Sequence, residues 1–251
     1  AQVGDLLKSS GAPDGVLGWK ILAGQSRPVI FPAASPQSLV ALALYQSLDG
    51  KVVDANGRPT LDAVVLAQVY ETFAEGARNG AFLPWITTLE NDAQAWQAFR
   101  EGRGDLLVTW SSSYLQDLPA DAVAVPFNGM QSTAFTLTNG WLWAVSDPFP
   151  ERRELSEKLV VFLSQSDFMS DWSEAAALLP ARPSALAAWK NQSLAAMLNL
   201  VALSAHVRPD GVLLTSLGPA LLESGLEVLK QKSAPLDAAN QAAGRLVFPN
   251  E

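Results

Sequence analysis

The sequence has no cysteine and a single histidine among its 251 residues. Without cysteine the chain can form no disulfide bond and has no thiolate to act as a nucleophile or a metal ligand. The one histidine, His206, stands alone in a polar stretch, so we expect neither a histidine-based catalytic triad nor a histidine-rich metal site. The sequence therefore predicts no catalytic residue, no metal site and no cofactor.

Positive charge is also scarce, with 17 Lys and Arg against 25 Asp and Glu and a net charge of -8. This balance, without a local cluster of basic residues, argues against a nucleic-acid partner. No run of 18 apolar residues occurs, so we expect no membrane span. The first residues lack the basic and apolar regions of an export signal, which we expect to be removed or to lie outside this sequence. Nucleotide-binding glycine motifs and the hydrolase motif Gly-x-Ser-x-Gly are missing as well.

The remaining composition, 49% hydrophobic and 17% charged, is typical of a globular protein. Strand and helix patterns alternate up to Ser146 and give way to helices alone, which predicts an α/β fold with few strands for its helices. The expected strands are 19–23, 29–31, 106–109, 123–127 and 133–145. The expected helices are 35–48, 61–79, 91–100, 151–164, 167–176, 184–189, 194–204, 217–230 and 236–246. Ser35, Ser166 and Gly80 are the expected caps of three of them.

A candidate ligand site follows the short apolar strand Leu106–Thr109. Trp110 and Tyr114 come next, separated by three serines, and ligands of open α/β sheets bind at the carboxyl ends of strands. Trp141 has a similar setting beside Asn139 and Gly140. Aromatic faces bind the C–H faces of a sugar ring, while hydroxyl, amide and guanidinium groups bind its hydroxyls. For each ring taken alone, packing in the core is an equal alternative.

Four runs of this sequence resemble one known family. They are AFREGRGDLLVTWSSSYLQDL (98–118), VAVPFNG (123–129), TNGWLWAVSD (138–147) and ERRELSEKLVVFLSQSDFMSDWSEAAALLPARPSAL (151–186). Their order is similar to that of bacterial extracellular solute-binding proteins of the maltose-binding-protein-like group. The run YQSLDGKVVDANGRPTLD (45–62) resembles the hairpin that precedes the next helix in that family. The resemblance extends over residues 15 to 248.

This resemblance implies lobes of the type II periplasmic-binding-protein fold, which close on a ligand like a clamp. It assigns residues 1–127 to the first segment of the C-terminal lobe, 128–195 to a partial N-terminal lobe and 196–251 to a second C-terminal segment. Family members have more chain ahead of the point where this sequence starts, so we expect an N-terminally truncated fragment. This expectation agrees with the small number of strands.

The resemblance also supplies ligand contacts. Tyr114 and Trp141 match stacking positions of sugar binders, and residues 35–37 match a ligand-binding loop. Two other stacking aromatics of the maltose binders are absent, one from that loop and one near Leu217, so a smaller sugar, a polyol or a non-sugar solute stays open. The expected ligand-binding set is Trp110, Tyr114, Trp141, Ser35, Gln37, Ser112, Asn139 and Arg182.

The function that this resemblance implies is the substrate-binding component of an ABC transporter, which captures a carbohydrate outside the cell. Its implied partners are a small solute and the permease subunits, and its implied location is periplasmic or extracellular, anchored as a lipoprotein. We also expect a homodimer joined through residues 128–195, or marked mobility of that segment. Two alternatives stay open, a carboxylate-dependent glycan-active enzyme and a lobe fragment that acts as an interaction module. A pair of carboxylates about 5 to 9 Å apart would favour the enzyme.

Overall fold

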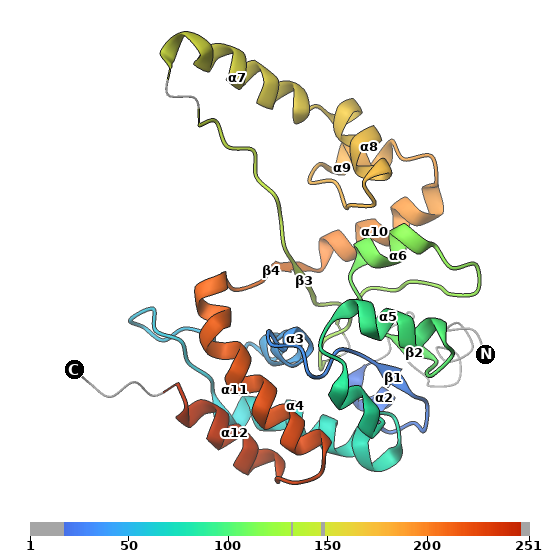
Figure 1. Ribbon diagram of the computed structural model, residues 1–251, viewed down its shortest axis with the longest axis vertical. Coiled ribbons are helices and arrows are strands. Elements are labelled where there is room, and N and C mark those ends of the chain that lie inside the picture. Colours follow the sequence, from blue (N-terminus) through green and yellow to red (C-terminus); the bar gives the residue numbers. More distant parts are fainter. Residues whose placement is uncertain (1–17, 132, 147–148, 247–251) are drawn as a thin grey trace. The chain divides into compact units, whose positions relative to one another are not determined.

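The computed structural model describes residues 18–131, 133–146 and 149–246, and these form two compact units (Figure 1). Unit 1 takes in the described residues up to Thr109, those of 127–137, and those from His206 onward. Unit 2 takes in 110–126 and the described residues of 138–205. These breaks differ from the expected ones after residues 127 and 195. The assignment of the segments to lobes stays a prediction.

Unit 1 holds a two-stranded parallel sheet and most of the buried core. Strand β1 (Val29–Ile30) pairs with β2 (Leu106–Leu107), with Val29 opposite Leu106 and Ile30 opposite Leu107. The surrounding elements are α2 (Trp19–Ala23), α3 (Leu39–Gln46), α4 (Ala63–Asn79), η2 (Pro84–Thr88), α5 (Asp92–Arg100), α11 (Gly211–Leu229) and α12 (Pro235–Gly244). Helix α4 packs against α2, α3, α11 and α12, so it is the central helix of this unit (Figure 1).

Helix α4 forms where local signals predict it. The Asp62 carboxylate accepts hydrogen bonds from the amides of Val64 and Val65, which would otherwise have no partner in the first turn. The helix ends at Gly80, whose φ of 81° lies in the left-handed region that glycine adopts without strain. The expected amphipathic helix is confirmed, because one face carries the buried residues Leu66, Val69, Tyr70 and Phe73.

An aromatic cluster fills the space between α4 and the sheet. The ring centroids of Phe31 and Phe82 lie 5.5 Å apart, and Trp19 lies 5.9 Å from each. Phe82 packs directly on Gly76 of α4, where a Cβ atom would come within 2.2 Å of the ring. The missing side chain of Gly76 therefore lets the ring pack against the helix.

Several expectations for unit 1 are wrong. Residues 19–23 form a helix and not a strand, because Trp19 and Ala23 share one buried face at helical spacing. The helix expected from Ser35 begins at Leu39, and its N-cap residue is Ser38, with a left-handed φ of 46°. Strand β2 covers only Leu106–Leu107 of the expected 106–109, and both residues are half-buried.

Helix α11 begins at Gly211, six residues before the expected start. Asp210 caps it by accepting a hydrogen bond from the Leu213 amide, and the helix continues through Pro219. Packing of its buried leucines against α4 and α12 outweighs the local cost of that proline. By length and composition α11 also passes for a membrane span, but half of it is buried within the unit, as in a core helix.

Unit 2 is helical. Its helices are α6 (Ser111–Asp117), α7 (Pro150–Leu163), α8 (Ser166–Ala175), α9 (Pro183–Ala187) and α10 (Gln192–Leu203). A small core gathers Leu115, Leu186, Trp189 and Leu198. The indole N–H of Trp189 donates to the Ser173 hydroxyl at 3.2 Å, which satisfies the buried polar atom of the ring.

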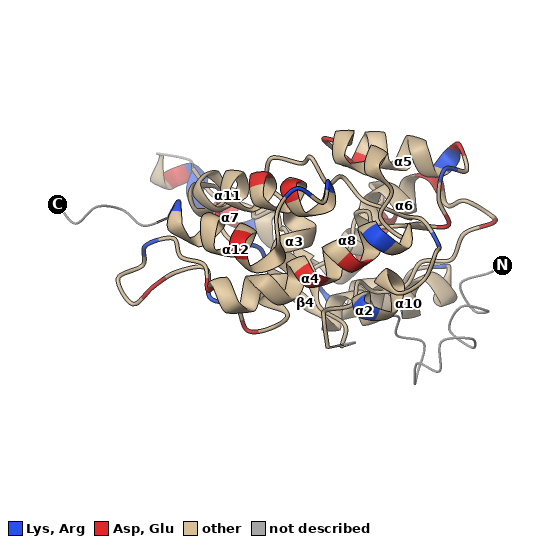
Figure 2. Ribbon diagram, turned by 90° about the horizontal axis from the view of Figure 1, so that it is seen from below, with Lys and Arg blue, Asp and Glu red and all other residues tan. Residues whose placement is uncertain are grey.

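The strands expected around unit 2 are shorter than predicted. Residues 123–127 form no strand, and the segment 133–145 contributes only β3 (Thr136–Thr138), which pairs with β4 (Ala205–Val207). Helix α8 begins at Ser166 itself, so the expected cap residue is its first helical residue and Gln165 precedes it. Helix α7 buries none of its described residues. Basic and acidic residues are scattered over the described elements, without a large basic patch in this view (Figure 2).

Candidate functional site

The parallel pairing of β1 and β2 brings two loops to one edge of the sheet. The chain after β1 enters the loop 31–38, and the chain after β2 continues to Thr109, the last residue of unit 1 before the break. Because parallel strands end at the same edge, both segments leave the sheet there. This edge is the candidate site in unit 1.

The loop after β1 is fixed on both of its sides. The Ala34 amide donates to the Leu89 carbonyl oxygen at 2.8 Å, and the Ser38 hydroxyl lies 3.5 Å from the carbonyl oxygen of Gly218 on α11. A Cβ atom on Gly218 would lie 2.2 Å from the Pro36 carbonyl oxygen, so this loop rests directly on the helix backbone. The loop is therefore held in place independently of any ligand.

The loop carries two of the predicted ligand contacts. Ser35 is half-buried and Gln37 is exposed. The amide oxygen of Gln37 accepts a hydrogen bond from the Arg208 guanidinium at 3.0 Å. Sequence reasoning missed Arg208, because 171 residues separate the two partners and no local pattern marks it.

Thr109 and Asp92 form the second polar pair at this edge. The Thr109 hydroxyl donates to an oxygen of the Asp92 carboxylate at 2.7 Å, and Asp92 is the first residue of α5. The carboxylate is favourably placed there, because the amino end of a helix carries partial positive charge.

Three of the predicted ligand contacts lie in unit 2, directly after Thr109 in the sequence. Trp110 precedes α6 and keeps 36% of its side-chain surface exposed. Ser112 and Tyr114 lie within α6 and are half-buried. The segment expected as a loop is therefore a short helix, whose first turn contains the three serines. Trp110, Ser112 and Tyr114 are not buried in the core.

The other predicted contacts of unit 2 lie on its surface. Trp141 is 87% exposed, and Asn139 accepts a hydrogen bond from the amide of Gly140 through its side-chain oxygen. Arg182 is exposed and precedes α9. Within 110–126 and 138–205, as far as they are described, the rings of Trp110, Tyr114 and Trp141 make no contact with one another.

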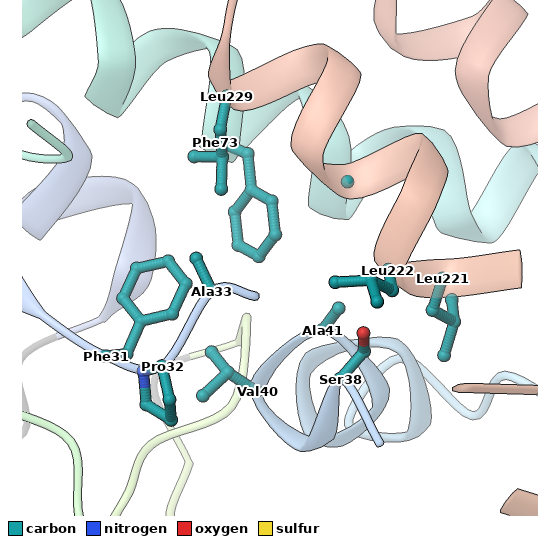
Figure 3. A pocket seen from close by; sticks show the side chains of 11 residues that line it. Phe31, Pro32, Ala33, Ser38, Val40, Ala41, Phe73, Leu221, Leu222 and Leu229 are labelled. Carbon is teal, nitrogen blue, oxygen red and sulfur yellow. The ribbon is translucent and has the colours of Figure 1, made fainter. Parts of the chain in front are cut away.

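A small cavity of unit 1 lies beneath the loop (Figure 3). It measures about 20 Å³ and is lined mainly by apolar side chains, with the Ser38 hydroxyl as a polar group. This volume holds one water molecule. The cavity is therefore too small to be the solute site.

Two burial effects on titratable groups lie outside the candidate site. Burial raises the pKa of Tyr45, whose hydroxyl also bonds with the backbone of Lys51 and Asp62. Burial likewise raises the pKa of Tyr70 well above its usual range. In the described part of the chain, no group of three or more His, Asp or Glu residues is arranged to hold a metal ion.

Comparison with solved structures identifies the fold. The maltose-bound MalE3 of T. maritima superposes with a TM-score of 0.68 at 19% identity, over 96% of this chain and 68% of that one. The sugar-binding protein MalE from Xanthomonas citri gives 0.72 at 14% identity, over 96% and 65%. The cyclic alpha-maltosyl-1,6-maltose binding protein from Arthrobacter globiformis gives 0.67 at 16%, over 96% and 67%. These matches confirm the expected α/β fold of type II periplasmic binding proteins.

Comparison of the sequence with protein families agrees with the fold. No curated protein matches this chain. The family described as "Bacterial extracellular solute-binding protein" matches residues 10–198, which is most of the sequence. The chain therefore belongs to the bacterial extracellular solute-binding proteins, as the motif series predicts.

Proposed function

We propose that this protein is the solute-capturing component of an ABC importer and that its solute is a carbohydrate. Membership of the extracellular solute-binding family supports the capture of a solute outside the cell. Three structural relatives are described by the sugars they bind or as sugar-binding proteins. Permease subunits are the corresponding proposed partners, and a periplasmic or lipid-anchored location is the proposed setting.

The observation that carries the carbohydrate proposal is the exposure of aromatic rings next to hydrogen-bonding side chains. Trp110 and Trp141 keep 36% and 87% of their surface exposed, and a serine helix turn and Asn139 lie beside them in sequence. An exposed indole costs free energy in water and gains a partner in the C–H face of a sugar. Ser35 and Gln37 on unit 1, with Ser112, Tyr114, Asn139 and Arg182 on unit 2, are the proposed polar and aromatic contacts.

Titration calorimetry with a panel of sugars tests this function. Glucose, galactose, maltose and maltotriose, together with the uronic acids used below, should include at least one ligand that releases or absorbs heat with saturation. Amino acids and short peptides serve as the matched non-sugar panel. If only an amino acid or a peptide gave saturable heat, the proposal that the solute is a carbohydrate would be wrong, while the proposal that the protein captures a solute would stand.

The proposal also states that the protein binds its solute without changing it. Nitrophenyl glycosides incubated with the protein should release no more nitrophenol than the same glycosides incubated with a Trp141→Ala variant. The reason is that the sequence has no cysteine and that its single histidine stands alone in a polar stretch, so we expect no Cys–His or Ser–His pair as nucleophile and base. Release that follows the protein through purification and falls on substitution of one carboxylate would favour the enzyme alternative instead.

A further inference from the structure

The loop after β1 presents hydrogen-bond donors at one place in unit 1. The Arg208 guanidinium bonds with the Gln37 side chain at 3.0 Å, and only an oxygen of Gln37 can accept from it. The Gln37 amide nitrogen, a donor with two hydrogens, is therefore left for another partner. The guanidinium has five N–H donors and uses one of them for Gln37. The pair thus offers several N–H donors, with the second lone pair of the Gln37 oxygen as its remaining acceptor.

The positive charge of this pair is not neutralised within the described part of the chain. Among the described residues Arg208 forms no ion pair with a carboxylate, whereas Arg27, Arg153, Lys158 and Arg245 each do. The nearest acid in sequence, Asp210, accepts a hydrogen bond from the Leu213 amide as the cap of α11. A planar guanidinium with free donors matches the two oxygens of a carboxylate.

The loop that carries Gln37 is held in place by contacts with other elements of unit 1. Contacts with Leu89 and Gly218 fix it, so a ligand would bind without first ordering the backbone. The Gln37 side chain bonds with Arg208, whereas the Asp92 carboxylate on α5 bonds with Thr109. A carboxylate such as Asp92 accepts hydrogen bonds from sugar hydroxyls but repels an anion. An anionic group of a ligand is therefore favoured at Arg208.

We propose that Arg208 and Gln37 bind the carboxylate of an acidic sugar, a uronic acid or its oligomer. This inference rests on the proposed carbohydrate function and narrows it to one class of sugar. Glucuronate and galacturonate are the natural probes, because they differ from glucose and galactose mainly by the carboxylate.

The experiment compares these two matched pairs by calorimetry on the wild-type chain and on variants. The uronate of one pair should bind at least about tenfold more tightly than its neutral sugar, since a hydrogen bond to a charged group is stronger than one between neutral groups. Arg208→Gln should remove that preference, Gln37→Ala should weaken it, and Arg208→Lys should restore only part of it. Affinity for the uronate should also fall as salt is added.

Arg58→Gln is the control, because Arg58 is an exposed arginine in the turn after α3, on the same unit. Circular dichroism melting of each variant confirms that it folds. Binding of glucose or galactose with no preference for the uronates, or an undiminished preference in Arg208→Gln, would overturn this inference and leave the carbohydrate function standing. If acetate or lactate bound with the same affinity as the uronates, the carboxylate site would stand but the proposal that its ligand is a sugar would be overturned. No saturable heat with any of these ligands would overturn both.

Discussion

The hydroxyl of Tyr70 on α4 lies 2.5 Å from the hydroxyl of Ser224 on α11. It also donates to the Leu221 carbonyl oxygen at 3.2 Å, and both side chains are buried. This contact joins two helices that are separated by more than 130 residues of sequence. It is a buried polar link within the core of unit 1, where each polar atom needs its partner.

The first prediction is that Tyr70→Phe lowers the free energy of unfolding by about 1 to 3 kcal/mol, because it leaves a buried Ser224 hydroxyl with fewer partners. Urea unfolding followed by circular dichroism measures the change. Tyr114→Phe is the control, since the Tyr114 hydroxyl makes no hydrogen bond with any described residue. An equal loss in both variants would show that the contact with Ser224 contributes nothing.

The same tyrosine predicts the response to alkaline pH. Burial raises the pKa of Tyr70 above its ordinary value of 10.0, so the folded chain keeps a proton that the unfolded chain releases. The unfolded state then binds fewer protons above pH 10, and the free energy of unfolding falls as the pH rises from there. In urea unfolding between pH 9 and pH 12, Tyr70→Phe should lose less stability over this range than the wild type. Parallel curves for the two proteins would contradict the assignment.

Gly218 and Gly225 on α11 make a matched pair for a third prediction. A Cβ atom on Gly218 would lie 2.2 Å from the Pro36 carbonyl oxygen, whereas on Gly225 its nearest neighbour would be 3.8 Å away. Gly218→Ala should therefore destabilise the protein by about 1 to 3 kcal/mol through overpacking. Gly225→Ala should be neutral or stabilise it by up to about 1 kcal/mol, because alanine favours a helix. Thermal melting of both variants decides, and a tolerated Gly218→Ala would mean that the loop is free to move.

Trp141 and Trp143 allow a sharp test of the sugar contacts. Trp141 is 87% exposed and Trp143 is 52% exposed, so neither substitution by alanine should change the melting temperature much. Trp141→Ala should weaken sugar binding about tenfold, since a lost stacking contact costs about 0.5 to 1.5 kcal/mol plus the buried area. Trp143→Ala should leave the affinity within about twofold. Calorimetry with the sugar that binds most tightly compares the two variants. A larger loss of affinity in Trp143→Ala than in Trp141→Ala would assign the stacking contact to Trp143.

The apolar surface of α7 predicts self-association. Leu155 is 66% exposed and Leu159 is 55% exposed, one turn apart on the same face. Exposed apolar patches of this kind tend to be covered by a partner. Light scattering should therefore give a mass near twice 26.7 kDa for the wild type. Leu155→Glu with Leu159→Glu should give a monomer, and Val64→Glu, at an exposed valine of unit 1, should not. A monomeric wild type would overturn this prediction.

The sequence by itself determined the elements whose signals are local. Gly80 marks the end of α4 in the sequence, and the structure uses it as the cap of the last turn, while Asp62 caps the first turn within one residue of the expected start. The helix expected at 91–100 forms as α5, one residue shorter, with Asn91 as its cap. The ordered motifs also determined the family, since they record residue types and not their positions in space.

Tertiary structure alone decided the features that depend on distant contacts. Residues 19–23 became a helix because Trp19 enters the aromatic core, and α11 continued through Pro219 because its leucines are buried against α4. The pairing of Arg208 with Gln37 joins residues 171 apart, and the Gly218 backbone supports their loop. Such contacts arise from packing free energy, which outweighs local propensities of a fraction of a kcal/mol to about 1 kcal/mol for each residue. The chemistry of the site in unit 1 is therefore set by the fold and not by any single stretch of sequence.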